Sequence, residues 1–300
     1  MSRRAYPLLP RRLFMQLRYA AERLGPGRWP AAADLLDRLD RLVFEPVWRD
    51  EELLVRERGV ILRIPAESVP GYARRRWEPL TTRALLRHLP RGGRFVDVGG
   101  HIGHFAAFAA RRVGVSGRVH VVEPAPDNVR LLEAMVTLNG FSQISIHAVA
   151  AGRASGMRAL QMMDHGDSHG FYPHPLATRT ASLNVPVHRL DELVEPPVDV
   201  IKVDVEGAEL DVLEGATGLL AADPPPVLVV EWNPASQESA GRDPLELPAA
   251  LERAGFESIE AIDERGFRTV SLEDARRLHE AGDLDGGRYV NLLARPEPRP

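Results

Sequence analysis

A glycine-rich turn between two apolar runs constrains this chain more than any other feature. The predicted strand 94–99 leads into the turn DVGGHIG, residues 97–103, and a helical pattern follows over 103–113. A second predicted strand, 118–123, ends at Glu123. Strand, glycine turn, helix, strand and terminal acid is the arrangement of a nucleoside-binding βαβ unit. Its glycines permit a tight turn and a close approach to a ligand, and its acid is placed to accept hydrogen bonds from ribose hydroxyls.

The spacing of this turn indicates which cofactor the unit binds. A dinucleotide-binding turn reads G-x-G-x-x-G, whereas this chain reads D-x-G-x-x-x-G from Asp97 to Gly103, with His101 in place of the second glycine. Asp97 would repel a diphosphate, because like charges repel at short range. S-adenosylmethionine has no phosphate and carries an ammonium and a sulfonium, so an acid beside it is favourable. The turn therefore favours S-adenosylmethionine.

A second group of charges lies in the predicted strand 199–205. Lys202, Asp204 and Glu206 occupy alternate positions of an apolar run, so all three point to one side of the strand. Charges on the face of a central strand are costly unless they pair or face a site. A buried ion-pair network without a ligand is the plain alternative. Lys202 is, however, the only lysine among 38 Lys and Arg residues, which indicates that a guanidinium would not fit there and favours a site.

In these motifs the chain resembles the FkbM-type S-adenosylmethionine-dependent methyltransferases. The DVGANIG-like turn of that family stands here as DVGGHIG, its EP dipeptide as Glu123-Pro124, and its K-x-D-x-E-G-x-E segment as residues 202–209. Further similarity lies in WEP (77–79), LNG (138–140) and VEWNP (230–234), so the resemblance covers residues 71–233. The chain departs from the family at Gly100-His101, where Ala-Asn is usual, and at His104, where an aromatic residue is common.

The resemblance implies an α/β fold of the class I methyltransferases, with a Rossmann-like, seven-stranded, mostly parallel sheet, helices on both faces and here a helical N-terminal extension. It also implies S-adenosylmethionine as cofactor and O-methylation of a small-molecule hydroxyl, on a sugar or a secondary metabolite. Ligands of such sheets bind at the carboxyl ends of the strands. The residues expected to contact the cofactor are Glu78, Thr81, Asp97, Gly99, Gly100, His101, Gly103, Glu123, Pro124, Ala150, Asp204 and Glu206.

Asp204 is the predicted catalytic residue. A hydroxyl acceptor must lose its proton, and the strand position of Asp204 makes it the best-placed base. Two alternatives stay open, because Asp204 could instead be a structural partner of Lys202 or help to bind magnesium. No full set of metal ligands is visible in the sequence, so no metal site is predicted.

Other residues also admit two interpretations. Glu78, with Thr81 and Thr82, touches the methionine end of the cofactor, as the resemblance implies, or caps the helix 82–89. Trp232 lines the acceptor site or fills the core, and we favour the core. Since Ala150 and its neighbours offer no acid, the adenine amino group must find backbone carbonyls or a loop residue such as Asp164.

Three histidines, His165, His169 and His174, lie in a loop rich in glycine and proline. They lack the spacing of ligands on a helix face, which speaks against a metal site. A loop over the strand ends is nonetheless where an acceptor would be covered, so one of them is a candidate acceptor contact.

Composition and charge exclude several classes of protein. The 300 residues include no cysteine, which rules out disulfides, thiolate nucleophiles and cysteine-bound zinc. A formal net charge of −4 gives no general attraction to nucleic acid or anionic membranes. No apolar run approaches the roughly 18 residues that span a bilayer, and the first residues lack a signal-peptide pattern. We therefore expect a cytoplasmic protein without a nucleic-acid partner.

Three segments are predicted. Residues 1–70 form a helical extension and a β-hairpin, residues 71–295 the S-adenosylmethionine-binding domain, and residues 296–300 a disordered tail. The basic amphipathic helices of the extension are expected to dock on this domain or on a second copy, giving a homo-oligomer, rather than on a membrane. The remaining predicted elements are helix 126–139, strand 144–149, a looser insertion at 152–198, strand 199–205, helix 209–220, strand 227–232, helix 244–254 and an antiparallel end formed by 258–262 and 289–294.

Two other function classes use a similar βαβ unit. A nicotinamide oxidoreductase would need the G-x-G-x-x-G turn and a catalytic Tyr-x-x-x-Lys or its equivalent, yet the sole lysine lies in a strand. A non-catalytic module that binds a nucleoside cofactor without turnover is the second alternative.

Overall fold

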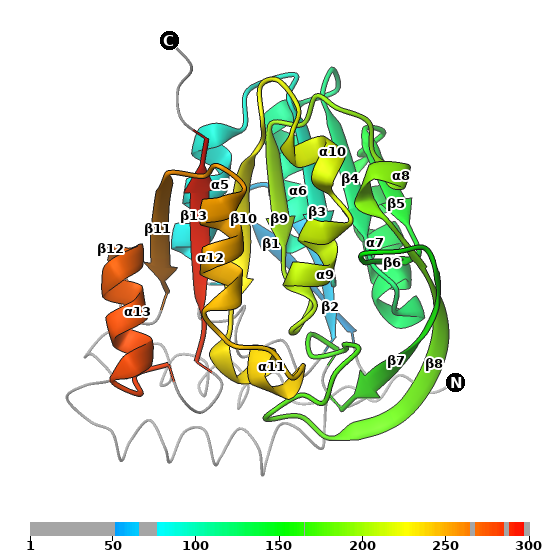
Figure 1. The fold of residues 1–300 in the computed structure, drawn as a ribbon. Helices are drawn as coiled ribbons and strands as arrows, with labels where there is room; N and C mark the ends of the chain where they lie inside the picture. Colours follow the sequence, from blue (N-terminus) through cyan, green and yellow to red (C-terminus); the bar gives the residue numbers. More distant parts are fainter. Residues whose placement is uncertain (1–51, 66–76, 165, 265–267, 285–287, 297–300) are drawn as a thin grey trace, which may run out of the picture. The chain divides into compact units, whose positions relative to one another are not determined.

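The computed structural model describes residues 52–65, 77–164, 166–264, 268–284 and 288–296 (Figure 1). The chain divides into two units, one made of residues 1–55 and 63–77 and the other of 56–62 and 78–300. Strands β1 (Glu52–Glu57) and β2 (Val60–Pro65) form a two-stranded sheet, where the sequence predicts a hairpin. The predicted helices of the N-terminal extension and most of the predicted tail lie outside the described residues.

The second unit contains a central sheet with strand order β12-β11-β13-β10-β9-β3-β4-β5. These strands are β3 (Arg94–Val98), β4 (Arg118–Val122), β5 (Ile144–His147), β9 (Val200–Val203), β10 (Val227–Trp232), β11 (Ser258–Asp263), β12 (Arg268–Ser271) and β13 (Val290–Arg295). The run from β5 to β10 is parallel, and β13 pairs antiparallel with both β10 and β11. The prediction of a mostly parallel α/β sheet is therefore confirmed.

In the described residues the sheet has eight strands, so the predicted number of seven is one short. The additional strand is β12, a four-residue strand at the end of the order given above, which pairs with β11. The predicted antiparallel end is present, because β11 pairs with β13. It is not a simple hairpin, since β12 and helix α13 (Leu272–Glu280) lie between the two strands in the sequence.

Helices cover both faces of the central sheet (Figure 1). On one face, residues of α9 and α12 pack against Val96, Ile201 and Val230. On the other, Leu80 and Ala84 of α5 pack against Val229 and neighbouring strand residues. The helices are α5 (Pro79–His88), α6 (His104–Val113), α7 (Pro126–Asn139), α8 (Leu190–Leu193), α9 (Glu209–Glu214), α10 (Thr217–Leu220), α11 (Pro234–Ser239), α12 (Glu246–Arg253) and α13.

The predicted helix 209–220 is broken into α9 and α10 at Gly215. A side chain at Gly215 would place its Cβ 2.0 Å from the carbonyl oxygen of Gly152, so the helix ends where the backbone of the insertion crosses it. The strand predicted at 144–149 is also interrupted, because β5 stops at His147 and β6 (Ala150–Ala151) belongs to another sheet.

The insertion at 152–198 is not loose, and this prediction was wrong. Strands β7 (Gly156–Met163) and β8 (Arg179–His188) pair antiparallel and join β6 in a three-stranded sheet. Asp211, a buried acid on α9, connects this sheet to the domain. Its carboxylate pairs with Arg153, Arg158 and Arg242 and accepts a hydrogen bond from the Tyr172 hydroxyl.

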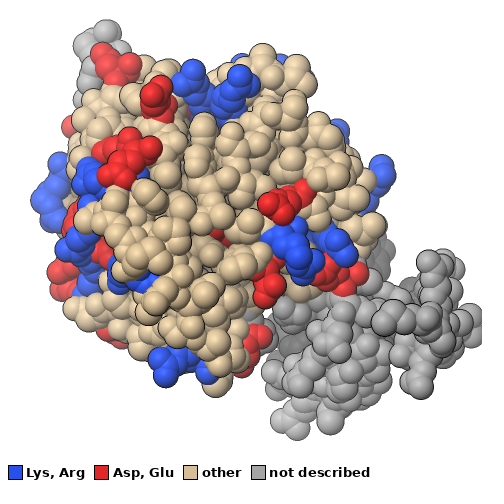
Figure 2. All heavy atoms as spheres, turned by 90° about the vertical axis from the view of Figure 1, so that its right-hand side faces the viewer, with Lys and Arg blue, Asp and Glu red and all other residues tan. Residues whose placement is uncertain are grey.

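Two surface properties bear on the expected partners. No helix in the described ranges is both long enough and apolar enough to cross a bilayer. On the face drawn in Figure 2, the coloured basic and acidic side chains are intermixed, without an extended patch of one sign among the residues that the structure describes.

Candidate active site

The glycine turn after β3 brings the ends of two strands together. Gly99 has a φ of +83°, and a Cβ built on it would lie 1.7 Å from the carbonyl oxygen of Asp204. A Cβ built on Gly100 would lie 2.1 Å from the side chain of Val121. One built on Gly103 would lie 2.6 Å from the side chain of Met135. The space that these glycines leave free is therefore filled by the protein. Packing within the protein thus requires glycine at these positions, and the close approach of the turn's backbone to a ligand stays a prediction.

Glu123, at the end of β4, fastens the turn. Its two carboxylate oxygens accept hydrogen bonds of 2.9 Å from the backbone amides of His101 and Ala125. Burial raises the pKa of Glu123, and these amides act in the opposite direction. The Asn128 side chain also bonds this carboxylate, so of the about four hydrogen bonds that an ionised carboxylate can accept, about one stays open to a ligand. Pro124 follows directly and leads into α7.

Asp97 lies beside Lys202 on the neighbouring strand, where the two residues are register partners. Only 1% of Asp97 is exposed, and neither of its carboxylate oxygens accepts a hydrogen bond of good geometry from the described residues. Burial raises the pKa of Asp97 to about 7, although Lys202 and the Ala106 amide oppose this. A buried acid of this kind is costly without a ligand and is typical of a functional site.

Lys202 and Asp204 form an ion pair with a buried and an accessible end. The Nζ of Lys202 lies 2.6 Å from Oδ2 of Asp204 and 4.5 Å from the centre of the Phe105 ring. The Lys202 side chain is 1% exposed and that of Asp204 27%. Burial disfavours the charge of Lys202, but the carboxylates of Asp204, Glu78 and Asp97 together raise its pKa.

Asp204 is therefore held in the ionised form. Burial raises its pKa, but Lys202 and a side-chain contact with Glu231 outweigh burial, and the net effect lowers the pKa of Asp204 below its ordinary value. The carboxylate lies at the carboxyl end of the central strand β9, next to the glycine turn. It is thus an ionised, partly exposed base at the place where ligands of parallel sheets bind.

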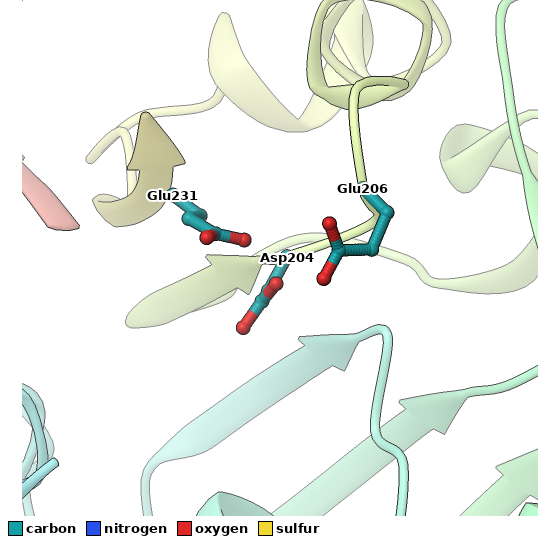
Figure 3. A group of neighbouring side chains, drawn as sticks. All are labelled: Asp204, Glu206 and Glu231. Carbon is teal, nitrogen blue, oxygen red and sulfur yellow. The ribbon is translucent and has the colours of Figure 1, made fainter. Parts of the chain in front are cut away.

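Three carboxylates converge at this edge of the sheet (Figure 3). Asp204 follows β9, Glu206 lies in the next loop with a φ of 53°, and Glu231 is on β10. One oxygen from each lies within 4.8 Å of the others. Glu206 Oε2 is 3.4 Å from both His174 Nε2 and Ser236 Oγ. Burial, the largest cause, and the charge of Asp204, the next largest, raise the pKa of Glu231 well above its ordinary value.

Glu78 does not cap its helix, so the capping interpretation of its side chain is wrong. It occupies the N-cap position of α5 with a φ of 40°, but its carboxylate accepts hydrogen bonds from the Tyr289 hydroxyl at 3.0 Å and the Asn291 amide at 2.9 Å. The same amide donates to the Thr81 hydroxyl at 3.2 Å. Burial raises the pKa of Glu78 to about 7, against the effect of Lys202. Glu78 and Thr81 are thus fixed by β13.

Several other predicted residues serve the fold. Trp232 is fully buried and donates to the Pro244 carbonyl at 2.8 Å, as the core interpretation expects. Ala150 lies in β6 beside β8 and is 3% exposed. Asp164 is exposed and accepts a hydrogen bond from the Thr178 amide within the β7–β8 segment. Glu209 accepts backbone hydrogen bonds from Val205 and Gly207, which stabilise the loop before α9.

Only one of the three histidines is seen to reach the carboxylates. His174 contacts Glu206, whereas His169 accepts a hydrogen bond from the Met163 amide, and His165 lies outside the described residues. Sequence reasoning missed Tyr289 and Asn291, which hold Glu78. The sequence signal that could have pointed to these two residues is the polar Asn291 inside the apolar run of the last strand.

Comparison with known proteins gives three similarities. Residues 97–258, more than half of the chain, match the family described as the methyltransferase FkbM domain. "Methyltransferase 1" of Beauveria bassiana (strain ARSEF 2860) is 33% identical over 142 residues, which are 40% of this chain and 57% of that protein. The crystal structure of methyltransferase FkbM from Methylobacillus flagellatus KT is 19% identical with a TM-score of 0.43, and the match covers 67% of this chain and 43% of that one. The chain thus spans little more than half of the first relative and less than half of the second.

Proposed function

We propose that this chain, which belongs to the FkbM family of S-adenosylmethionine-dependent methyltransferases, methylates a hydroxyl group of a small molecule, a sugar or a secondary metabolite. The match over residues 97–258 gives the family and the cofactor, and it speaks against the nicotinamide oxidoreductase alternative. The observation that carries the hydroxyl acceptor is the ionised, partly exposed carboxylate of Asp204 beside the glycine turn.

The residues around the turn fit S-adenosylmethionine, which supplies a methyl group activated by a sulfonium. Glu123 keeps about one acceptor position for a ribose hydroxyl, while its other contacts hold the turn in place. The carboxylate of Asp97 lacks a hydrogen-bonding partner of good geometry, and we assign the cofactor's ammonium to it. Glu78 and Thr81, held by Asn291, lie on the same cofactor side in this proposal.

Asp204 is assigned to the proton of the acceptor. A hydroxyl attacks a methyl group effectively only when it is aligned with it at about 3 Å, and it must lose its proton during or after the attack. Oδ2 of Asp204 is engaged by Lys202, so Oδ1 is the atom that takes this proton. Lys202 acts through Asp204, because it fixes the carboxylate and keeps it ionised.

His174 is assigned to the acceptor side and not to the proton transfer. Its Nδ1 accepts a hydrogen bond from the Leu176 amide, so in the neutral ring the proton is on Nε2, which faces Glu206. Both ring nitrogens are thus occupied. We infer that the β7–β8 segment uses His174 and Glu206 to cover the acceptor.

A methyl-transfer screen tests this function. The purified chain is incubated with S-adenosylmethionine labelled in its methyl group and with a panel of sugars and polyhydroxylated metabolites, matched to analogues in which the hydroxyls are replaced by amines. Label is expected in a methyl ether, identified by mass spectrometry of the product. Label found only on the amine analogues, or in no member of either panel, would contradict the proposal.

A further inference from the structure

The three converging carboxylates have more oxygen atoms than the surrounding donors occupy. Lys202 engages only Oδ2 of Asp204, and both His174 and Ser236 engage the same oxygen of Glu206, Oε2. Glu231 is only 5% exposed, yet among the described residues no group outside this cluster donates to it. Figure 3 shows its carboxylate directed toward those of Asp204 and Glu206. Each acid therefore has at least one oxygen directed at the others and not at a donor.

The nearby positive charge does not balance these acids. Lys202 is shared with two further carboxylates, Glu78 and Asp97, which also lie near it. His174, the other basic side chain at this site, contacts Glu206 alone. Buried carboxylates are stable when they are paired or bind a metal ion. Glu231 has neither a basic partner nor a hydrogen-bond donor from the described residues outside this cluster, so a cation bound between the three acids would supply the positive charge that its ionised form lacks.

We propose that Asp204, Glu206 and Glu231 bind one hard divalent cation of the Mg²⁺ and Mn²⁺ class. Such ions prefer oxygen ligands, and every ligand offered here is a carboxylate oxygen. Ligand distances of about 2.0–2.1 Å for Mg²⁺ place two oxygens on opposite sides of one ion about 4.0–4.2 Å apart. The three oxygens lie within 4.8 Å of one another, so small rotations of these side chains would bring them onto one ion.

The role of this cation in catalysis rests on the proposed function. The test of its binding does not. An acceptor hydroxyl bound to the cation would lose its proton more easily, because a cation lowers the pKa of an oxygen bound to it. Oδ1 of Asp204 has two lone pairs, so one would face the cation while the other takes the proton of the acceptor, and Lys202 keeps Oδ2. The sheet edge would thus present the acceptor oxygen at a fixed position beside the glycine turn.

Binding of Mn²⁺ to the full chain tests the site without any turnover. The protein is treated with chelator, dialysed and titrated with Mn²⁺, and the free ion is followed by electron paramagnetic resonance. We expect one site with a dissociation constant below about 1 mM, which Mg²⁺ displaces. Glu231→Gln and Glu206→Gln should each weaken binding about tenfold or more. Glu273→Gln, which alters a 63% exposed side chain on α13, is the matched control and should bind like the parent.

The outcomes separate cleanly. Absence of saturable Mn²⁺ binding by the parent, or binding that a folded Glu231→Gln variant leaves unchanged, would overturn the proposal. Thermal melting shows whether each variant is folded, and Glu206→Gln decides the question if Glu231→Gln does not fold. Because neither methyl donor nor acceptor is present, a negative result here would leave the proposed methyl transfer intact.

Discussion

The ammonium of Lys202 lies 2.6 Å from the carboxylate of Asp204, and the two residues are two positions apart at the end of the same strand. The lysine is buried beneath the site and the aspartate reaches its surface. The arrangement presents an ionised base to a ligand while its counter-ion is kept from solvent. A guanidinium is planar and larger, so it could not take this position over the Phe105 ring without displacing its neighbours.

Replacement of Lys202 by methionine should destabilise the fold severely. Asp204, Glu78 and Asp97 would lose the cation that they share, and removal of one partner from a buried ion pair typically costs about 3–5 kcal/mol. Urea unfolding of Lys202→Met and Lys202→Arg measures the effect, and arginine should not restore the parent's stability. A Lys202→Met variant as stable as the parent would show that the pair is dispensable.

Gly99→Ala should lower the free energy of unfolding by more than the strain of an alanine in the left-handed conformation explains. Gly140→Ala is the matched control, since Gly140 also has a positive φ, +65°, but has open space where a Cβ would be. The control should lose about 1–2 kcal/mol. Gly99→Ala should lose more and should also bind S-adenosylhomocysteine poorly, because its Cβ would displace the Asp204 carbonyl. Equal losses in denaturant unfolding would contradict this account of the turn.

Asp97→Asn should change how stability depends on pH. The pKa of Asp97 is raised to about 7 in the folded state, so the native protein binds this proton more tightly than the unfolded chain. Ionisation of Asp97 therefore lowers the stability of the parent above pH 7, and the loss is relieved as the pH falls through 7. Asparagine removes this effect while keeping the size of the side chain.

The measurement is the difference in unfolding free energy between Asp97→Asn and the parent, taken at pH 8 and at pH 6. Buried histidines such as His104, whose pKa is lowered by burial, titrate in the opposite sense, so only this difference is diagnostic. The unfolding free energy of the variant minus that of the parent should be roughly 1 kcal/mol higher at pH 8 than at pH 6. A difference that does not depend on pH would contradict the assignment.

Glu123→Gln tests the ribose contact. The amide keeps the shape of the side chain but weakens hydrogen bonds to a charged acceptor, which are worth about 1.5–3 kcal/mol. Affinity for S-adenosylhomocysteine, measured by calorimetry, should fall about 10- to 100-fold. Glu133→Gln, at an exposed position of α7, should bind as the parent does. If both variants bind like the parent, Glu123 stabilises the turn but does not bind the ribose.

The features that the sequence predicted well are those specified by neighbours along the chain. Helix α7 begins and ends where predicted, because Pro126 opens it and Gly140 takes the left-handed conformation after it. The alternation of Lys202 and Asp204 likewise placed this ion pair at the end of β9, but the predicted strand 199–205 stops at Val203 and Glu206 lies in the loop that follows it. The resemblance in the glycine turn and the following motifs is confirmed by the family match over residues 97–258.

What could not be predicted depends on contacts between distant parts of the chain. The insertion is ordered by Asp211, whose arginine partners are 58, 53 and 31 positions away in the sequence. Glu231 stands in the family motif VEWNP, but only its place on β10 beside β9 directs it at Asp204. The packing role of Gly100 and Gly103 was not predicted, because the side chains of Val121 and Met135 that fill the space beside them come from β4 and α7.

The rate of methyl transfer by Asp204→Asn tests the central claim most directly. With an acceptor from the screen and saturating S-adenosylmethionine, kcat should fall by at least about 100-fold, because the amide cannot accept the proton. The dissociation constant of S-adenosylhomocysteine should stay within about twofold of the parent's value, since a change confined to the chemical step leaves binding intact. A kcat equal to that of the parent would contradict the account and leave Asp204 as a structural partner of Lys202.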